Sequence, residues 1–237
     1  MCGRFTISVV IGLSERFQAR NPSFELIPRY NIAPSQDVPV VVRAHPDDAV
    51  HEIRMMRWGL VPSWVKDPSR SPKPINARAD TLNEKPMFRD LLQTKRCLIP
   101  ATGFYEWKKE VWGRTPYYIR MRDNSLFAFA GLFDTYRAPD SEEISTFSII
   151  TTEPNAVVSP YHDRLPAILK GEDEERWLGS GVLCRDELSA LLHPYPASGM
   201  EAYAVGKKVN NPDAEGEDLI QPVPSLTNHS WDRTQGG

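Results

Sequence analysis

Proline constrains this chain more than any other residue, because 21 of its 237 residues are proline and they are spread along its whole length. Proline breaks a helix beyond the first turn and removes a hydrogen-bond donor from a central strand. The longest apolar runs, such as 127–133, are far shorter than the roughly 20 residues that a membrane-spanning helix needs. We therefore expect short helices, short strands, many connections, no membrane span and no secretory signal.

Hydrophobic periodicity favours strands over helices. Strands are predicted over 38–43, 51–58, 96–107, 144–151 and 202–205, with a bulge or sheet edge at Pro100. A turn at His45-Pro-Asp-Asp is expected to join the first two strands, and a hairpin to join 115–121 to 126–133. Short helices are predicted over 14–20, 80–95 with an interruption at Pro86, 173–178 and 185–192. No repeat or linker divides the chain. We predict an α+β fold: a single domain over residues 1–221 with a largely antiparallel sheet or barrel-like core flanked by short helices, and a flexible C-terminal tail over 222–237.

The charges are distributed unevenly. The formal net charge is −3, which argues against a protein that coats nucleic acid through bulk charge. However, residues 1–137 carry 21 Lys+Arg and 14 Asp+Glu, whereas residues 138–237 carry 7 and 17. Folding could mix these charges. The alternative is a basic cleft built mostly from the first part of the chain, with the acidic excess on the opposite face.

Cysteine and histidine spacing gives no sign of a metal site. Cys2, Cys97 and Cys184 contain no C-x-x-C pair, and the five histidines do not repeat at helical ligand spacing. We expect no metal and no cofactor. Three cysteines are also too few for a disulfide scaffold, so a reducing, cytosolic location is expected.

The most specific feature is the start of the chain, Met1-Cys2-Gly3-Arg4. If Met1 is removed, Cys2 carries an α-amine with a pKa near 7.7–8.0 and a thiol with a pKa near 8.5 on adjacent carbons. This pair suits amide hydrolysis by an N-terminal nucleophile. It equally suits capture of an aldehyde, in which the amine forms a Schiff base and the thiol closes a thiazolidine ring. A third interpretation is a cysteine that only packs.

Three other residues could assist such chemistry. Glu106 follows an apolar stretch and lies among aromatic residues, where burial would raise its pKa and make it an acid near neutral pH. His162 lies in a proline-flanked loop and titrates near neutral pH. Asn76 could orient the Cys2 amine by hydrogen bonds. The alternatives are a strand-end carboxylate, a surface histidine and a helix N-cap.

Six segments in order carry a resemblance to a known family. They are Met1-Cys-Gly-Arg-Phe5, Trp58-Gly-Leu-Val-Pro-Ser-Trp64, Asn76-Ala-Arg-Ala-Asp80, the stretch from Pro100 that includes Gly103-Phe-Tyr-Glu-Trp107, Phe129-Ala-Gly-Leu-Phe133 and His162-Asp-Arg-Leu-Pro166. Together they resemble the SOS response-associated peptidase (SRAP) family from residue 1 to about residue 212. The resemblance implies the SRAP fold and a protein that crosslinks to abasic sites in single-stranded DNA during the DNA damage response.

The resemblance also implies roles for individual residues. Cys2 would form the crosslink after autoproteolytic removal of Met1, Asn76 would orient its amine, Glu106 would act as an acid and His162 would transfer protons. DNA contacts are expected from Arg4, Trp64, Arg78, Arg89, Thr151 and Arg164. Of the tryptophans, we expect Trp58 and Trp107 in the core and Trp64 at the surface, where it could stack on a base.

The implied partner is therefore single-stranded DNA containing abasic sites, bound by a monomer. The expected location is cytoplasmic, with nucleoid association when the protein is on damaged DNA. Weak lyase activity is expected as a side reaction of the Schiff base. Two other functions stay open: a thiol peptidase or amidohydrolase with an N-terminal nucleophile, and a single-strand DNA-binding module without a covalent step.

Overall fold

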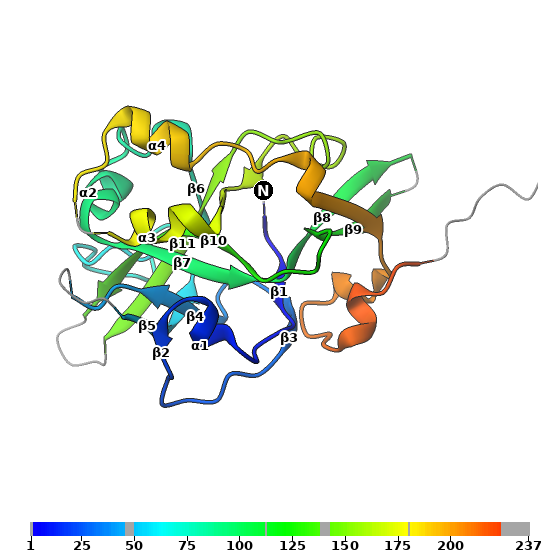
Figure 1. Cartoon of the computed structure of the whole chain (residues 1–237), viewed down its shortest axis with the longest axis horizontal. Coiled ribbons are helices and arrows are strands. Elements are labelled where there is room, and N and C mark those ends of the chain that lie inside the picture. The colour runs from blue at the N-terminus through cyan, green and yellow to red at the C-terminus, as the bar shows by residue number, and fades with distance from the viewer. Residues whose placement is uncertain (1, 46–49, 112, 138–142, 180, 224–237) are drawn as a thin grey trace, which may run out of the picture.

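Two sheets form the centre of the protein (Figure 1). The structure, a computed structural model, describes residues 2–45, 50–111, 113–137, 143–179 and 181–223. In the larger sheet, strands pair in the order β11–β10–β7–β4–β5, and β5 also pairs with β11, which closes a five-stranded barrel. These strands are β4 (Asp37–Val42), β5 (His51–Trp58), β7 (Arg96–Ala101), β10 (Phe127–Tyr136) and β11 (Ile144–Thr152). The β11–β5 pair is parallel and the other four pairs of the ring are antiparallel.

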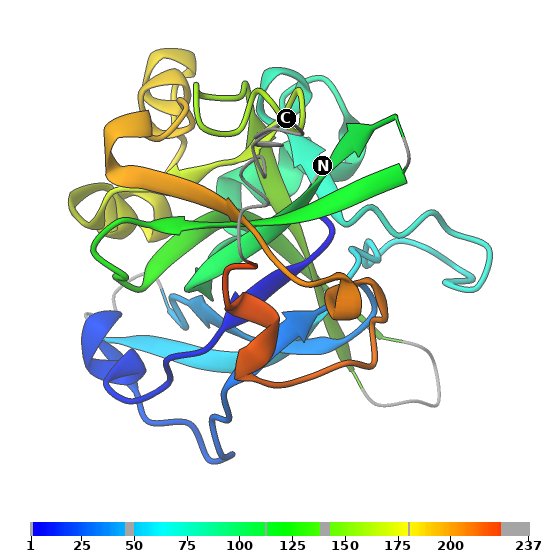
Figure 2. The ribbon, with the colours of Figure 1, turned by 90° about the vertical axis from the view of Figure 1, so that its right-hand side faces the viewer.

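Short strands extend the barrel. These are β2 (Ala19–Arg20) on β5, β6 (Asn76–Arg78) and β12 (Leu165–Pro166) on β11, and β13 (Ile168–Leu169) on β10. The second sheet is antiparallel and has the order β14–β9–β8–β1–β3. Its strands are β1 (Phe5–Ile7), β3 (Arg29–Ile32), β8 (Gly103–Glu110), β9 (Gly113–Met121) and β14 (Met200–Ala204). In Figure 2 the orange β14 lies along the green β9. The predicted α+β fold with a largely antiparallel, barrel-like core is confirmed.

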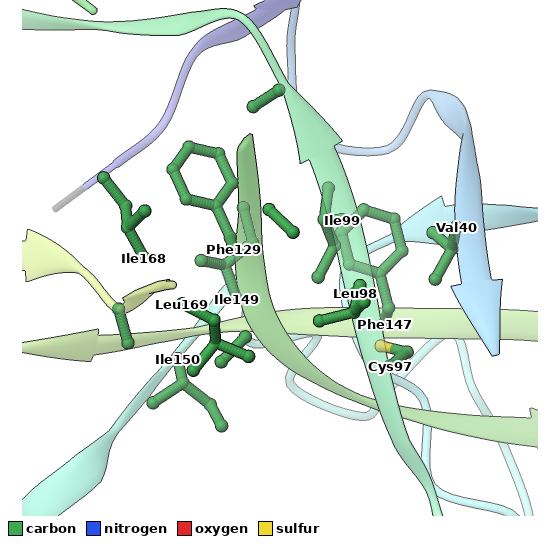
Figure 3. Packing of buried hydrophobic residues seen from close by; sticks show 14 of the residues in the cluster. Val40, Cys97, Leu98, Ile99, Phe129, Phe147, Ile149, Ile150, Ile168 and Leu169 are labelled. Carbon is green, nitrogen blue, oxygen red and sulfur yellow. The ribbon is translucent and has the colours of Figure 1, made fainter. Parts of the chain in front are cut away.

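The hydrophobic core fills the barrel and the space between the sheets. Figure 3 shows how side chains from β4, β7, β10, β11 and β13 interlock there. Trp58 is fully buried, as predicted, and packs against Phe5 and Phe147 with ring centroids 5.1 and 6.3 Å away. Its indole nitrogen donates to the Ile75 carbonyl at 2.9 Å, which satisfies the buried donor. The Phe5 contact joins β1, just after the chain start, to the barrel.

Four short α-helices are described. They are α1 (Leu13–Arg16), α2 (Pro86–Thr94), α3 (Gly171–Leu178) and α4 (Arg185–Leu191). The last three lie on one side of the molecule in Figure 1, where α2 and α3 contact β7 and β10. Pro86 begins α2 instead of interrupting a longer helix, because proline fits the first helical position. A 3₁₀ helix, η1 (Ala79–Thr81), precedes it.

Two sequence predictions are wrong in detail, and a third is confirmed. The helix expected over 14–20 ends at Arg16, since Gln18 takes a left-handed φ of 49° and the next two residues pair with β5. The strand expected over 96–107 is two strands, separated at Thr102, that belong to different sheets. At Pro100, strand β7 pairs with β10 on one side, whereas β4 reaches β7 only at Leu98. Of the predicted bulge or sheet edge at this proline, the edge is confirmed, as a local one.

The hairpin predicted between 115–121 and 126–133 is also wrong. Both segments are strands, but β9 pairs with β8 and β14, whereas β10 pairs with β7 and β11. Strand β9 forms its hairpin with β8 instead, because the connection between these two strands is very short: Glu110 at the end of β8 pairs with Gly113 at the start of β9. The turn at residues 122–123, closed by the Asn124 N–H on the Met121 carbonyl, instead leads the chain from one sheet to the other.

Two further predictions lie largely outside the described residues. The turn expected after His45 includes residues 46–48, and the tail expected over 222–237 is described only as far as Val223. Pro222 forms an antiparallel bridge with Val205. The domain boundary at residue 221 stays a prediction. Among the described residues, no helix has the length and apolar character needed to cross a membrane.

Candidate functional site

Cys2 lies buried just before β1. Its side chain has no exposed surface, and its Sγ lies 3.9 Å from the Arg4 carbonyl oxygen, to which the thiol donates. Burial raises the pKa of the Cys2 thiol, and the negative charge of Glu106 raises it further. The thiol is therefore protonated at neutral pH, and Glu106 is close enough to act on it.

Asn76 holds the backbone of Cys2 from the side of the barrel. β6 pairs in parallel with β11, with Asn76 opposite Ile149, and the Asn76 side chain then reaches the start of the chain. Its Nδ2 donates to the Cys2 carbonyl oxygen at 2.9 Å. Its Oδ1 is buried and accepts no hydrogen bond from the described residues. Arg78 occupies the N-cap position of η1, so the helix-cap interpretation of Asn76 is wrong.

Glu106 lies on β8 and is 5% exposed. Burial raises the pKa of its carboxyl, and this is the largest influence on the group. A carboxyl group in such surroundings keeps its proton at a pH where an ordinary glutamate has lost it. The interpretation of Glu106 as an ordinary strand-end carboxylate therefore does not fit its burial.

His162 lies in the loop between β11 and β12. Burial lowers the pKa of His162, and the charge of Asp163 acts in the opposite direction. Two groups approach its Nδ1: the Arg164 backbone N–H at 3.0 Å, which needs a lone pair there, and Asp163 Oδ1 at 2.7 Å, which needs a proton there. In a neutral imidazole only one nitrogen carries a proton. Nε2 therefore carries it when Nδ1 accepts from Arg164, and has a free lone pair when Nδ1 donates to Asp163, so Nε2 is able either to donate or to accept a proton.

A cleft of about 740 Å³ lies between Glu106 and His162. Glu106 and Trp107 line it from β8, and Tyr161 and His162 line it from the loop opposite. Tyr161 also stacks on Tyr117 of β9, with ring centroids 4.4 Å apart, which fixes the loop against the second sheet. The structure thus brings the four predicted chemical residues together: Asn76 contacts Cys2, the charge of Glu106 acts on Cys2, and Glu106 shares the cleft with His162.

Arg78 and Arg164 are joined through one carboxylate. Arg78 Nη2 lies 2.6 Å from Asp80 Oδ2, and Arg164 Nη2 lies 3.8 Å from Asp80 Oδ1. Arg164 also donates to the Thr151 carbonyl at 2.5 Å. Thr151 itself is fully buried and its hydroxyl is 3.5 Å from the Ala77 carbonyl. The two arginines therefore form one positively charged group beside β6.

The other predicted DNA contacts are more dispersed. Arg4 donates from Nη1 to Asn31 Oδ1 at 2.7 Å and to the Val209 carbonyl at 2.9 Å. Its guanidinium also lies 5.8 Å from the centre of the half-buried Trp107 ring, which is less enclosed than predicted. Trp64 is 67% exposed, as predicted. Arg89 lies on α2, where it pairs with Asp90 at 3.4 Å.

Comparison with known proteins decides the family. The family model described as SOS response associated peptidase (SRAP) matches residues 1–212. The chain belongs to the SRAP family. Among SRAP relatives, the abasic site processing protein YoqW of Bacillus subtilis is 43% identical over 225 residues, covering 93% of this chain and 99% of YoqW. The abasic site processing protein HMCES of Mus musculus is 34% identical, covering 88% of this chain and 69% of HMCES.

The SRAP fold is also supported by a solved structure. A crystal structure of a protein from Bacteroides thetaiotaomicron superimposes with a TM-score of 0.83 at 31% identity. It covers 94% of this chain and 100% of that protein. The barrel and second sheet described above are therefore shared with a protein known from experiment.

The SRAP site contains residues that sequence reasoning missed. Lys109 and Arg114 line the cleft from the β8–β9 hairpin, and Asp163 and Tyr161 line it from the loop. Lys109 and Arg114 are brought together by the strand register, which places them opposite each other. Asp163 directly follows His162, which was the available sequence signal. Within the described ranges, no group of three His, Cys, Asp or Glu side chains lies together as a metal site would require.

Proposed function

We propose that this SRAP protein processes abasic sites in single-stranded DNA by forming a covalent crosslink through Cys2 after Met1 is removed. The names of YoqW and HMCES support abasic-site processing, since both are abasic site processing proteins. The observation that carries the covalent step is the contact between Asn76 and Cys2 beside the buried Glu106. That arrangement provides a nucleophile, a group that orients it and an acid.

The chemistry begins at the amine. The Cys2 α-amine attacks the aldehyde carbon of the ring-opened abasic sugar, and a proton moves to the aldehyde oxygen. Loss of one water molecule from the resulting carbinolamine gives a Schiff base. The Cys2 sulfur then bonds to the imine carbon while its proton moves to the nitrogen, which closes a five-membered thiazolidine ring. One water molecule is released, and the steps need no oxidant.

Glu106 and His162 divide the proton transfers in this proposal. Glu106 donates to the ring oxygen of the sugar as the ring opens and to the hydroxyl that leaves as water, which the raised pKa of its carboxyl allows. His162, across the cleft, takes the proton released by the attacking amine and returns one to the adduct. The same steps in reverse release the crosslink. Asn76 keeps the amine aimed at the cleft and has a buried Oδ1 to accept its N–H.

The burial of the Cys2 thiol supports this order of steps. A thiol peptidase needs a thiolate, which a lowered pKa provides. Burial and the charge of Glu106 act on Cys2 in the opposite sense. These influences argue against a general thiol peptidase. The peptidase step kept in this proposal is removal of Met1 by Cys2 itself, because there the thiol and the bond to be cleaved are held next to each other in one chain. Weak lyase activity would arise as a side reaction, because a Schiff base permits β-elimination.

DNA contacts in this proposal are made mainly to the backbone. Arg78 and Arg164, joined through Asp80, bind phosphates beside β6, and Arg4 and Arg89 add further polar contacts. Thr151 is fully buried, so in this proposal it acts indirectly, through the carbonyl oxygen that accepts from Arg164. The exposed Trp64 stacks on a base next to the abasic site, a contact worth roughly 1–3 kcal/mol. A monomer located in the cytoplasm, and on the nucleoid when DNA is damaged, is sufficient for this activity.

The test is a denaturing gel of purified protein incubated with a single-stranded oligonucleotide that carries one abasic site. Mass spectrometry first establishes that Met1 is absent. A band that survives denaturation is expected with the wild type and with Cys184→Ala, which removes an exposed cysteine elsewhere. Cys2→Ala should lose the thiazolidine. No adduct from correctly processed wild-type protein would disprove the proposal.

The same samples separate the two alternative functions. Release of ammonia from glutamine, or cleavage of a peptide other than the protein's own start, would favour the amidohydrolase. Binding that ignores the abasic site and is unchanged in Cys2→Ala would favour a non-covalent single-strand DNA-binding module.

A further inference from the structure

Two cations face each other across the β8–β9 hairpin. Lys109 on β8 is the direct register partner of Arg114 on β9. Like charges directly opposite one another on neighbouring strands destabilise a sheet. A threonine or a carboxylate in place of one of the two cations would make the hairpin more stable. The repulsion between Lys109 and Arg114 therefore destabilises the hairpin locally, and a bound anion would remove this repulsion.

Although the Asp163 carboxylate lines the same cleft, no carboxylate of the described residues forms an ion pair with either cation. Neither Lys109 nor Arg114 forms an ion pair or a side-chain hydrogen bond with a described residue. Glu110, the nearest carboxylate along the strand, accepts from the Thr115 hydroxyl at 2.7 Å. By contrast, Arg120 on the same strand β9 pairs with Glu201 of the adjacent β14 at 2.9 Å. Arg120 is thus neutralised on the β14 side, whereas Lys109 and Arg114, beside the turn of the hairpin, have no such ion pair with a described residue.

Both cations belong to the wall of the cleft that holds Glu106 and His162. The positive charge of Lys109 also helps to lower the pKa of His162. Arg78 and Arg164 lie at a different place, beside β6 on the barrel. Positive charge is therefore present both beside β6 and on the β8–β9 hairpin. A polyanion with several linked charges matches this arrangement better than a single small anion.

We propose that Lys109 and Arg114 form a second phosphate-binding site, which holds the DNA backbone on the hairpin side of the cleft. The identity of the polyanion rests on the proposed function above. Lys109 would act as a point charge and Arg114 as a forked donor to phosphate oxygens. These contacts read no base. They direct the strand across the cleft so that the abasic sugar lies between the two sets of cations.

The first test measures binding without crosslinking. The dissociation constant of an unmodified single-stranded oligonucleotide is measured from 50 to 200 mM salt for the wild type and for the double variant Lys109→Ala/Arg114→Ala. Each single-strand phosphate contact contributes about 0.7 to the slope of log K against log salt, so the slope should fall by about 1.4. Over this range the wild type should then lose about sevenfold more affinity than the variant.

A matched control variant loses the same two positive charges as Lys109→Ala/Arg114→Ala, but at another place on the protein. Arg54→Ala/Arg57→Ala removes two exposed cations from β5, where they pair with Glu52 and Asp37. Its salt slope should equal that of the wild type. If both double variants lower the slope equally, the effect is bulk charge and the proposed site is wrong. An unchanged slope in Lys109→Ala/Arg114→Ala would also overturn it.

The second test locates the phosphates. Oligonucleotides with one abasic site carry a single uncharged methylphosphonate at successive positions on either side of it. Neutralising the phosphates that Lys109 and Arg114 bind should weaken wild-type binding but not binding by the double variant. A scan in which no position distinguishes the two proteins contradicts the site.

The two proposals can fail separately. Binding of unmodified DNA does not depend on Cys2 chemistry, so a wild type that binds with the expected slope but forms no adduct refutes only the crosslinking function. A wild type that forms the adduct while the double variant binds and reacts equally well refutes only the hairpin site. Melting temperatures of the variants establish that each has folded.

Discussion

The side-chain amide of Asn76 donates to the carbonyl oxygen of Cys2 at 2.9 Å, so a strand of the barrel fixes the residue at the start of the chain. Asn76→Asp replaces this donor with a carboxylate that repels the carbonyl oxygen. We expect the rate of adduct formation to fall at least tenfold, because the amine is no longer aimed into the cleft. Single-turnover gel kinetics measures the rate. Asn124→Asp makes the same change of charge on an exposed turn and should react like the wild type.

Glu106→Gln removes the proposed acid with almost no change in shape. Adduct formation and its reversal should both slow by roughly 10²–10⁴-fold, the usual contribution of general acid catalysis. The pKa of Glu106 is raised, so the wild-type rate should persist above the range of an ordinary carboxyl and fall as pH rises through the raised pKa. This decline should be absent in the variant.

The control for this prediction is Glu110→Gln, at the exposed end of the same strand β8. It should leave both rates within about twofold of the wild type, as expected for a surface change away from the reaction. Urea unfolding excludes a trivial loss of folding, since Glu106→Gln should be at least as stable as the wild type above neutral pH, where it avoids a buried charge. A normal reaction rate in Glu106→Gln would show that the acid lies elsewhere.

Asp163 should tune the proton affinity of His162, since its carboxylate lies 2.7 Å from Nδ1. Its negative charge stabilises the imidazolium, so Asp163→Asn should lower the pKa of His162 beyond the lowering that burial causes. If neutral His162 acts as the base, the acidic limb of the rate profile then moves to lower pH. NMR titration of the ring proton and the rate profile provide two independent readouts. Asp123→Asn, in an exposed turn, should shift neither.

Arg96 should matter for stability and not for chemistry. Its buried guanidinium donates to the carbonyls of Leu92 at 2.6 Å and Trp177 at 2.5 Å, and also to that of Gly179, near the ends of α2 and α3. Arg96→Met leaves these carbonyls without a donor and should lower the free energy of unfolding by about 3 kcal/mol. Urea denaturation measures this. Arg176→Met, which breaks the exposed pair with Glu187, should cost at most about 1 kcal/mol.

The sequence predicted the local elements better than their partners. The strands near 51–58 and 144–151 followed from their apolar patterns, which depend only on neighbouring residues. The barrel closes through the parallel β5–β11 pair, which joins segments about 90 residues apart. No local pattern specifies such a pairing. The same limit explains the wrong hairpin, since β9 and β10 each had a better partner elsewhere.

For the site, the sequence by itself determined the chemical inventory: a thiol at Cys2, a carboxyl at Glu106 among aromatic residues and an imidazole at His162. These follow from residue type and order, which also carry the resemblance to the SRAP family. Only the tertiary structure decided that Asn76 contacts Cys2, that the thiol is buried beside Glu106, and that Lys109 faces Arg114 in the same cleft. Burial and proximity arise when distant segments pack together, and they set the pKa of each group, so the order of residues alone could not give them.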